Sequence, residues 1–284
     1  MQTRFIQKPD RLITFLNPWR IVVHLSRHRG LIGPLTRREL QSRYKGSILG
    51  LFWTFIQPLL LLAVYTFVFS VIFKTRWGVV AQDEGRLGFA LALFAGILTF
   101  SIIGDVLSAA PGIILGHANF VKRVVFPLEI LPLVKLLGTV IHALTGMTIL
   151  ILVLAIDRRH LNGTLILLPV VWLPVLFFSL GWAYFFSSLG VFIRDLGATI
   201  QILVTVLFFL SPIFYPLEAV PERFRFFCRL NPVANFVENT RLVVLGGSCP
   251  DWGLYAIHFA VSLIIFTTGF IWFMKSRKAF ADVL

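Results

Sequence analysis

The sequence predicts an all-α polytopic membrane protein with six transmembrane helices. Of the 284 residues, 57% are hydrophobic and 14% are charged, and the mean hydropathy is +0.86; soluble domains carry about 25% charged residues. Six continuous apolar runs can each cross about 30 Å of hydrocarbon at 1.5 Å per residue. They cover residues 47–73, 87–110, 130–156, 165–193, 198–215 and 252–274. A β-barrel would instead alternate apolar and polar residues over short segments, so helices are expected.

The positions of the basic residues predict that both chain ends lie in the cytoplasm. The net charge is +13, and Lys and Arg are most frequent before the first run and in loops that parity places on the same side, as the positive-inside bias requires. Such a charge would also suit nucleic acid. However, basic residues that flank apolar spans usually contact lipid head groups, so we expect membrane lipids and no nucleic acid as partners.

The chain divides into a cytoplasmic segment, residues 1–46, and a six-helix membrane domain, residues 47–284. In the first segment, Asn17 and Pro18 are typical of the start of a short surface helix, and Gly30 is typical of the position after its end.

A second helix is expected over residues 35–45, restarting after Pro34 and bending at Gly46 into the first span. Its charge and position favour a helix at the membrane interface, although a solvated linker is the alternative. The side chains that would define it are Arg37, Arg38, Arg43, Tyr44 and Lys45.

Two loops differ from simple connections. Residues 111–129, cytoplasmic by parity, are short and marked by prolines, and their centre predicts one or two helical turns. Residues 216–251, external by parity, alternate apolar clusters with prolines and arginines. Because backbone that enters a bilayer without crossing it must be shielded, this stretch predicts either two half-inserted helices or a folded cap on the membrane. Its two cysteines, Cys228 and Cys249, are expected as a disulfide or as free thiols.

Motifs for catalysis are missing from the sequence. It contains no GxxxxGK[ST], HExxH or GxSxG pattern and no paired-cysteine metal spacing, so we predict no catalytic residue, metal site or cofactor for this chain. Within the spans, Asp105 and Lys135 are the ionisable residues that we take as candidate functional residues. A structural ion pair between them is favoured over an ion-coupling site.

Three stretches together resemble one family: RYKGSILGLFWTFIQPLL, NFVKRVVFPLEILP and FIRDLGATIQILVTVLFFLSPIFYPLEAVPERFRFFCRLNP. They are similar to the transmembrane subunit of type-2 ABC exporters of the polysaccharide group, which export O-antigen, capsule and teichoic acid chains. The resemblance runs from about Leu35 to the end of the sequence.

The resemblance implies a homodimer in the inner membrane, driven by two copies of a separate ABC ATPase that carry ATP and Mg, with a lipid-linked polysaccharide as substrate. The half-inserted helices would occupy residues 217–245. A coupling helix seated in the ATPase would consist of Asn119, Phe120, Val121, Lys122 and Arg123.

Aromatic residues are abundant, with 29 Phe, 7 Trp and 5 Tyr. The resemblance implies a conduit at the dimer interface, lined by the first and fifth helices. Aromatic faces can stack on sugar rings, so we expect some of these rings to line it, although for any single ring a position facing lipid or at the membrane interface is favoured. The candidates are Trp53, Phe55, Tyr65, Phe69, Phe208 and Tyr215. An exporter of a drug or small lipid, a stand-alone secondary transporter and a polytopic membrane enzyme are the competing functions.

Overall fold

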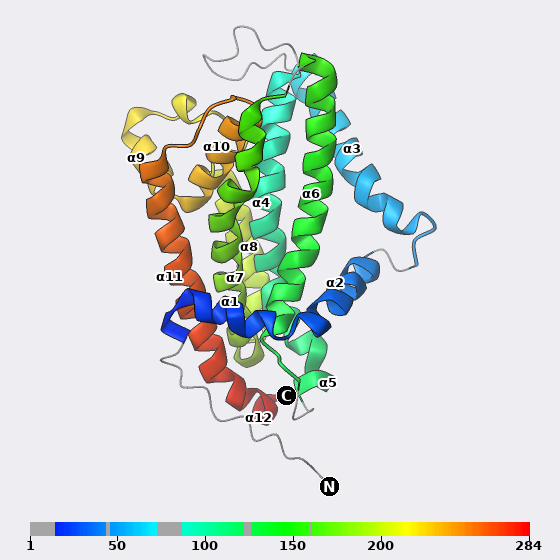
Figure 1. Cartoon of the computed structure of the whole chain (residues 1–284), viewed down its shortest axis with the longest axis vertical. Coiled ribbons are helices and arrows are strands. Elements are labelled where there is room, and N and C mark those ends of the chain that lie inside the picture. Colours follow the sequence, from blue (N-terminus) through cyan, green and yellow to red (C-terminus); the bar gives the residue numbers. More distant parts are fainter. Residues whose placement is uncertain (1–14, 44–45, 73–86, 122–125, 160) are drawn as a thin grey trace.

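The computed structural model describes residues 15–43, 46–72, 87–121, 126–159 and 161–284. These residues form a helical bundle, as the sequence predicts. Its longest members run side by side along the molecule (Figure 1): α4 (Gly88–Ile113), α6 (Ile130–Arg158), α7 (Leu168–Phe192) and α11 (Trp252–Ser276). Within the described residues, four helical stretches, built on these four helices, are long and apolar enough to cross a membrane.

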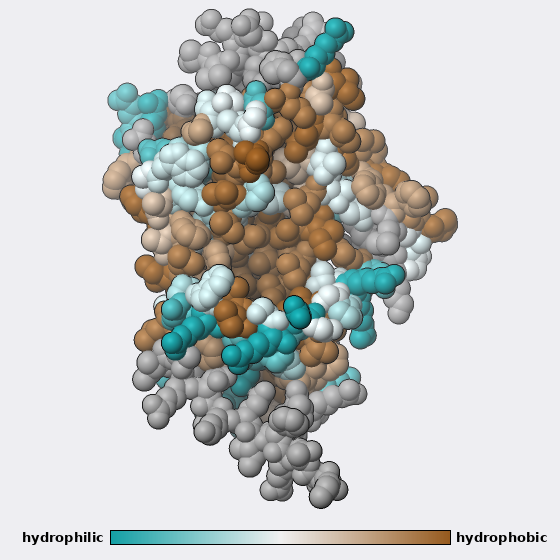
Figure 2. Space-filling view, in the orientation of Figure 1, coloured by the Kyte–Doolittle hydropathy of each residue, from teal (hydrophilic) through white to brown (hydrophobic). Residues whose placement is uncertain are grey.

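The first and fifth predicted spans form shorter apolar helices. The first is α3 (Trp53–Tyr65), which continues as the π-helical segment η3 (Thr66–Ile72), and the fifth is α8 (Leu196–Leu210). Figure 2 shows apolar side chains forming a broad belt around the middle of the visible face, with polar side chains above and below it. The molecule is therefore a multi-pass membrane protein.

Helix α4 forms the centre of the bundle. In the most apolar 18-residue window of α4, 83% is buried, whereas the buried share of the corresponding window is 33% in α6 and in α11. Helix α4 packs on α6, α7, α8 and α10. Helix α7 lies between α4 and α11 and crosses α11 very closely, because a Cβ atom added at Gly181 would lie 2.6 Å from the backbone of Ile265. These contacts fix the frame on which the shorter helices sit.

The short helices gather at the two ends of the bundle (Figure 1). One end, here called the α5 end, carries α1 (Pro18–Ser26), α2 (Arg29–Arg43), α5 (Ala118–Val121) and α12 (Phe280–Val283). The other, the α10 end, carries α9 (Glu222–Leu230) and α10 (Pro232–Val244). Short 3-10 turns complete the described elements: η2 (Gly50–Phe52), η5 (Leu115–His117), η6 (Gly163–Leu167), η7 (Leu217–Ala219) and η8 (Arg277–Ala279).

The start of α1 agrees with the sequence, but the boundary between α1 and α2 does not. The Asn17 side chain accepts a hydrogen bond from the backbone N–H of Trp19, which confirms the expected cap. Helix α1 then ends at Ser26, and α2 begins at Arg29 and continues through Pro34. The predicted restart after Pro34 is therefore wrong. Because Gly30 is exposed, water can satisfy the carbonyl that Pro34 leaves without a donor.

Candidate functional site

The predicted coupling loop forms a short helix that folds back onto its own hairpin. The ring of Phe120 stacks on the ring of Phe126, with 4.3 Å between their centroids. The His117 ring also stacks on Phe120, with a centroid distance of 5.6 Å. His117 is held in turn by a hydrogen bond of 2.8 Å to the carbonyl of Ile113, at the end of α4. These contacts attach α5 to the hairpin of α4 and α6.

The structure places the other predicted coupling residues unevenly. Asn119 is exposed and Val121 is half-buried, whereas Lys122 and Arg123 lie outside the described residues. Phe120 is half-buried and faces the protein's own hairpin rather than solvent. Its role as an anchor in a partner stays a prediction. In this structure the stacked Phe120 ring also holds α5 against the hairpin.

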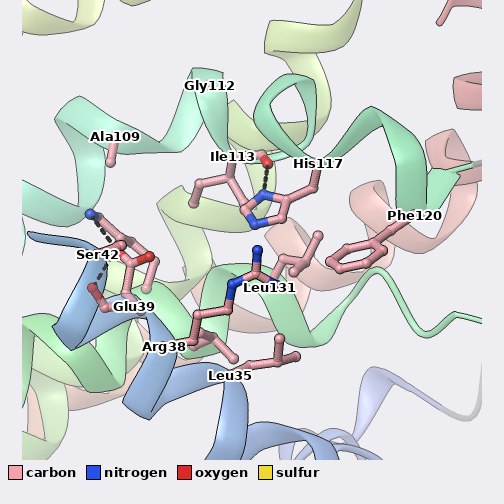
Figure 3. Close-up of a pocket in the computed structure, with 12 residues that line it drawn as sticks. Leu35, Arg38, Glu39, Ser42, Ala109, Gly112, Ile113, His117, Phe120 and Leu131 are labelled. Carbon is pink, nitrogen blue, oxygen red and sulfur yellow. Dashed lines mark hydrogen bonds and ion pairs between the residues drawn. The ribbon is translucent and has the colours of Figure 1, made fainter. Parts of the chain in front are cut away.

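Beside Phe120 lies a cavity of about 440 Å³ between α2, α4, α5 and α6. Figure 3 shows Arg38 of α2, His117 and Phe120 among its lining side chains. The lining is mixed, with Leu35 and Leu131 beside the charged groups. Helix α2 and the predicted coupling helix therefore line one cavity.

Helix α2 is also tied to the bundle by charge. The Lys135 ammonium of α6 donates a hydrogen bond of 2.8 Å to the Glu39 carboxylate of α2. The ion pair predicted between Lys135 and Asp105 is therefore wrong. Asp105 lines a different cavity, of about 470 Å³, together with Gln57 of α3 and His142 of α6. The apolar runs placed Lys135 and Asp105 in spans but could not show which helix each side chain faced.

The residues chosen for the interfacial helix fall mostly on the predicted element. Arg37 and Arg38 are exposed on α2, and Arg43 is its last residue. Tyr44 and Lys45 lie outside the described residues. Gly46 has a φ of +87°, a left-handed conformation that a side chain would strain, which fits the predicted bend before the first span.

A polar cluster that the sequence did not predict lies at the same end of the molecule. Glu129, just before α6, is 3% exposed at its side chain; His24 lies 3.0 Å from one carboxylate oxygen, and Arg277 lies 2.8 Å from the other. The buried Tyr184 hydroxyl donates to the Glu129 carbonyl at 2.9 Å. Burial raises the pKa of Glu129, but the His24 hydrogen bond and the charge of Arg277 outweigh it, so the pKa is lowered overall.

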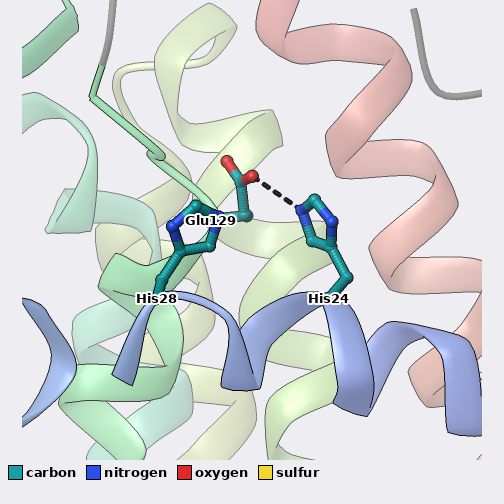
Figure 4. Close-up of side chains that lie close together, drawn as sticks. All are labelled: His24, His28 and Glu129. Atoms are coloured by element: carbon teal, nitrogen blue, oxygen red, sulfur yellow. Dashed lines mark hydrogen bonds and ion pairs between the residues drawn. The ribbon is translucent and has the colours of Figure 1, made fainter. Parts of the chain in front are cut away.

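This cluster attaches α1 to the bundle. Ile21 and Leu25 are the buried apolar residues of α1, while Trp19 is 70% exposed. His28, in the turn after α1, lies beside His24 and Glu129 (Figure 4). The spacing of the two histidines, four residues apart, was the one available signal, because it places them on the same face of a helix.

At the α10 end, one arginine fixes the predicted helix pair. Arg241 of α10 is 4% exposed. Its guanidinium donates hydrogen bonds of 2.9, 2.6 and 2.6 Å to the carbonyls of Ala92 in α4, Pro212 and Ile213. Glu238, one turn earlier, lies 3.8 Å from it. Arg241 therefore joins α10 to the start of α4 and to the turn after α8.

The two helices of the predicted pair differ in burial. Helix α10 packs on α4 and α7 and is largely buried, whereas α9 is mainly exposed. The choice between half-inserted helices and a folded cap on the membrane stays a prediction. The two cysteines of this region, Cys228 and Cys249, are free, so the disulfide is not formed in this structure.

The candidate lining aromatics differ in exposure. Phe55 is 57% exposed, and Trp53, Tyr65 and Tyr215 are partly buried; the side chain of Phe69 is outside the description. Phe208 packs between Phe100 and Phe214, with centroid distances of 4.9 and 5.0 Å.

The neighbour of Phe208 is the more open residue. Phe209, which is absent from the predicted set, is 60% exposed. The sequence places two phenylalanines side by side at these positions but does not show which of the two rings faces outward.

The fold and these contacts define a class. The chain is a multi-pass helical membrane protein with a short helix, α5, in one hairpin and a helix pair at the opposite end, of which α10 is largely buried. Residues 31–245 match the family described as ABC-2 type transporter. The chain belongs to this family, which confirms the family expected from its three sequence stretches, and it is a transport component.

Curated relatives are similar along most of the chain. The O-antigen export system permease protein RfbA of Myxococcus xanthus is 26% identical over 93% of this chain and 98% of its own length. The protein of the same name from Klebsiella pneumoniae is 24% identical over 89% of this chain and 95% of its own. The polysialic acid transport protein KpsM of Escherichia coli is 23% identical, covering 74% of this chain and 79% of its own.

Proposed function

We propose that this chain is the permease subunit of an ATP-driven exporter that moves a lipid-linked polysaccharide from the cytoplasm across the inner membrane. The observation that carries the proposal is similarity over nearly the whole chain to permeases named for O-antigen export. Similarity to a polysialic acid transport protein supports the same substrate class.

The proposal includes a six-span topology with the α5 end and both termini in the cytoplasm. The 13 residues of α3 and the 7 of η3 together approach the length that a span needs, which is about 20 residues. Helix α8 has 15 residues, and a short span can be accommodated by local thinning of the bilayer. Helix α10 is half-inserted from the outside in this topology, and its burial against α4 and α7 supports that placement.

The functional unit is a homodimer with two ATPase subunits, which bind ATP and Mg. Support for the homodimer comes from α3 and α8, which bury only narrow stripes: Thr54, Pro58 and Leu62 in α3, and Ile200 and Val204 in α8. The remaining apolar side chains face outward and are available to a second copy. The exposed ones are Phe55, Leu59, Leu60, Leu61 and Val64 in α3, Phe67 in η3, and Ile202, Leu203, Val206, Phe209 and Leu210 in α8.

A transport cycle follows from the contacts at the α5 end. Closure of the ATPase pair on ATP moves α5, and the Phe120–Phe126 stack passes this motion to the hairpin of α4 and α6. Helix α2 follows, because it shares the cavity with α5 and is bonded to α6 through Glu39 and Lys135. The motion reaches the wall of the conduit, along which exposed aromatic rings stack on successive sugars.

The coupling step is tested by Phe120→Asp. A carboxylate in place of the stacked ring is expected to release α5, so that co-purification of the ATPase and glycan export both fall at least about tenfold. The matched control is Phe226→Asp on α9, where the ring is 64% exposed at the opposite end of the bundle; it should leave both quantities unchanged. If Phe120→Asp behaves like the control, the coupling assignment is wrong.

The substrate class is tested by deleting the gene in the native host. We expect the surface glycan to disappear while its lipid-linked form accumulates on the cytoplasmic side, and the wild-type gene to restore export. Normal surface glycan with increased sensitivity to a drug would instead identify an exporter of small molecules and overturn the polysaccharide assignment.

A further inference from the structure

Three potential metal ligands from two separate parts of the chain meet at the α5 end. His24 lies in α1, His28 lies in the turn that follows α1, and Glu129 immediately precedes α6. One ligand atom from each residue lies within 4.8 Å of the other two. Figure 4 shows both imidazoles rising from the helix backbone toward the Glu129 carboxylate. The cluster is separate from the coupling helix and its cavity.

The spacing of the rings suits a shared ion. The centroids of His24 and His28 are 5.6 Å apart, with an angle of 76° between the ring planes. A Zn–N bond of about 2.0–2.1 Å and a tetrahedral angle place two ligating imidazoles with their centroids about 5–5.5 Å apart. Glu129 Oε1 lies 3.0 Å from His24 Nε2, near the separation of about 3.3 Å expected for two ligands of one zinc ion. Small side-chain shifts would therefore close the site.

The surroundings hold two of the three ligands in place. Arg277 donates to Glu129 Oε2 at 2.8 Å, which leaves Oε1 directed at the histidine pair. The rings of Phe15 and Phe270 contact the His24 ring edge-on, with centroid distances of 5.3 and 6.2 Å. Ligating carboxylates and imidazoles in metalloproteins are oriented by such neighbouring groups.

We propose that His24, His28 and Glu129 bind a divalent transition metal ion, with zinc as the best match. Two imidazoles and one carboxylate suit zinc, whereas calcium and magnesium prefer oxygen ligands alone. A water molecule would complete the coordination. The ion would cross-link α1 to the start of α6 and, through Arg277, to the end of α11. This proposal does not depend on the transport assignment.

The test uses the full-length protein, purified in detergent without a histidine tag and stripped with a chelator. Competition with a chromogenic zinc indicator should reveal one ion per chain, and zinc should raise the midpoint of thermal unfolding. Cobalt in place of zinc should give visible absorption bands of a site with nitrogen and oxygen ligands. Lack of binding by the wild-type protein would overturn the proposal.

Two variants and a control locate the ion. His28→Ala removes a half-buried ring from a turn and should weaken zinc binding at least about tenfold. His24→Gln keeps a hydrogen-bond donor for Glu129 but removes the imidazole, and it should weaken zinc binding to a similar extent. His117→Ala, which alters the histidine beside Phe120, should bind zinc like the wild type. Unchanged binding by His28→Ala and His24→Gln would place any zinc elsewhere and contradict the proposal.

Discussion

The two ends of the bundle are held together by different kinds of polar contact. At the α5 end, Glu39 of α2 forms an ion pair with Lys135 in which both side chains are partly exposed, at 30% and 23%. At the α10 end, the buried Arg241 donates to three backbone carbonyls at once. Water can replace a partly exposed partner at little cost, whereas carbonyls buried without a donor are expensive. Helix α2 is therefore suited to rearrange and the α10 end to stay intact.

This difference has a consequence for the transport cycle. Because Arg241 joins α10 to the start of α4 and to the turn after α8, these three segments should move as one body. In the proposed cycle, opening at the α10 end would then come from displacement of this whole body rather than from separation of α10 from α4. At the α5 end, α2 would shift relative to the bundle.

The largest effect on stability is expected from Arg241→Met. This change keeps much of the side-chain volume but leaves three buried carbonyls without their donor, which should destabilise the fold by about 2–4 kcal/mol. The midpoint of thermal unfolding in detergent should fall by at least about 5 °C. The control is Arg223→Met, since Arg223 is exposed on α9 with its guanidinium 4.8 Å from the Phe224 ring. Equal shifts for the two variants would contradict the difference between the ends.

A smaller effect is expected from Phe208→Ala, which tests how well the C-terminal end of α8 is packed. The Phe208 ring packs on Phe100 and Phe214, so its removal should cost about 2–3 kcal/mol. Phe209→Ala, which removes the neighbouring exposed ring, should change stability by less than about 1 kcal/mol and instead slow export severalfold. If Phe209→Ala is the more destabilising variant, the assignment of their faces is wrong.

The smallest stability effect is expected at the α5 end, from the pair of Glu39 and Lys135. Glu39→Lys or Lys135→Glu alone should lower stability by about 1 kcal/mol or less, because both groups are partly exposed. Export should suffer more than stability, since α2 loses its tie to α6. The double variant with exchanged charges should recover export. Failure of this rescue, with both single variants impaired, would show that the ion pair does not carry the coupling.

The helices were predictable from the sequence because the bilayer demands long apolar segments, and α4, α6, α7 and α11 follow the predicted runs closely. The Asn17 cap was predictable because its partner lies two residues away. The central polar contacts were not, because they join distant residues: His24 and Glu129 are 105 positions apart, and Arg241 and Ala92 are 149 apart. Apolar runs also do not show which face of a helix is buried, which explains the wrong partner for Lys135.

Transport in a reconstituted system tests the central claim most directly. Purified permease and its ATPase would be placed in liposomes with lipid-linked polysaccharide, and the glycan protected inside ATPase-outward vesicles would be measured with ATP and Mg, with a non-hydrolysable analogue and with an ion gradient. Protected glycan is expected only when ATP is hydrolysed and both subunits are present. Glycan uptake by the permease alone under an ion gradient, or ATP hydrolysis by the assembled complex without glycan uptake, would contradict it.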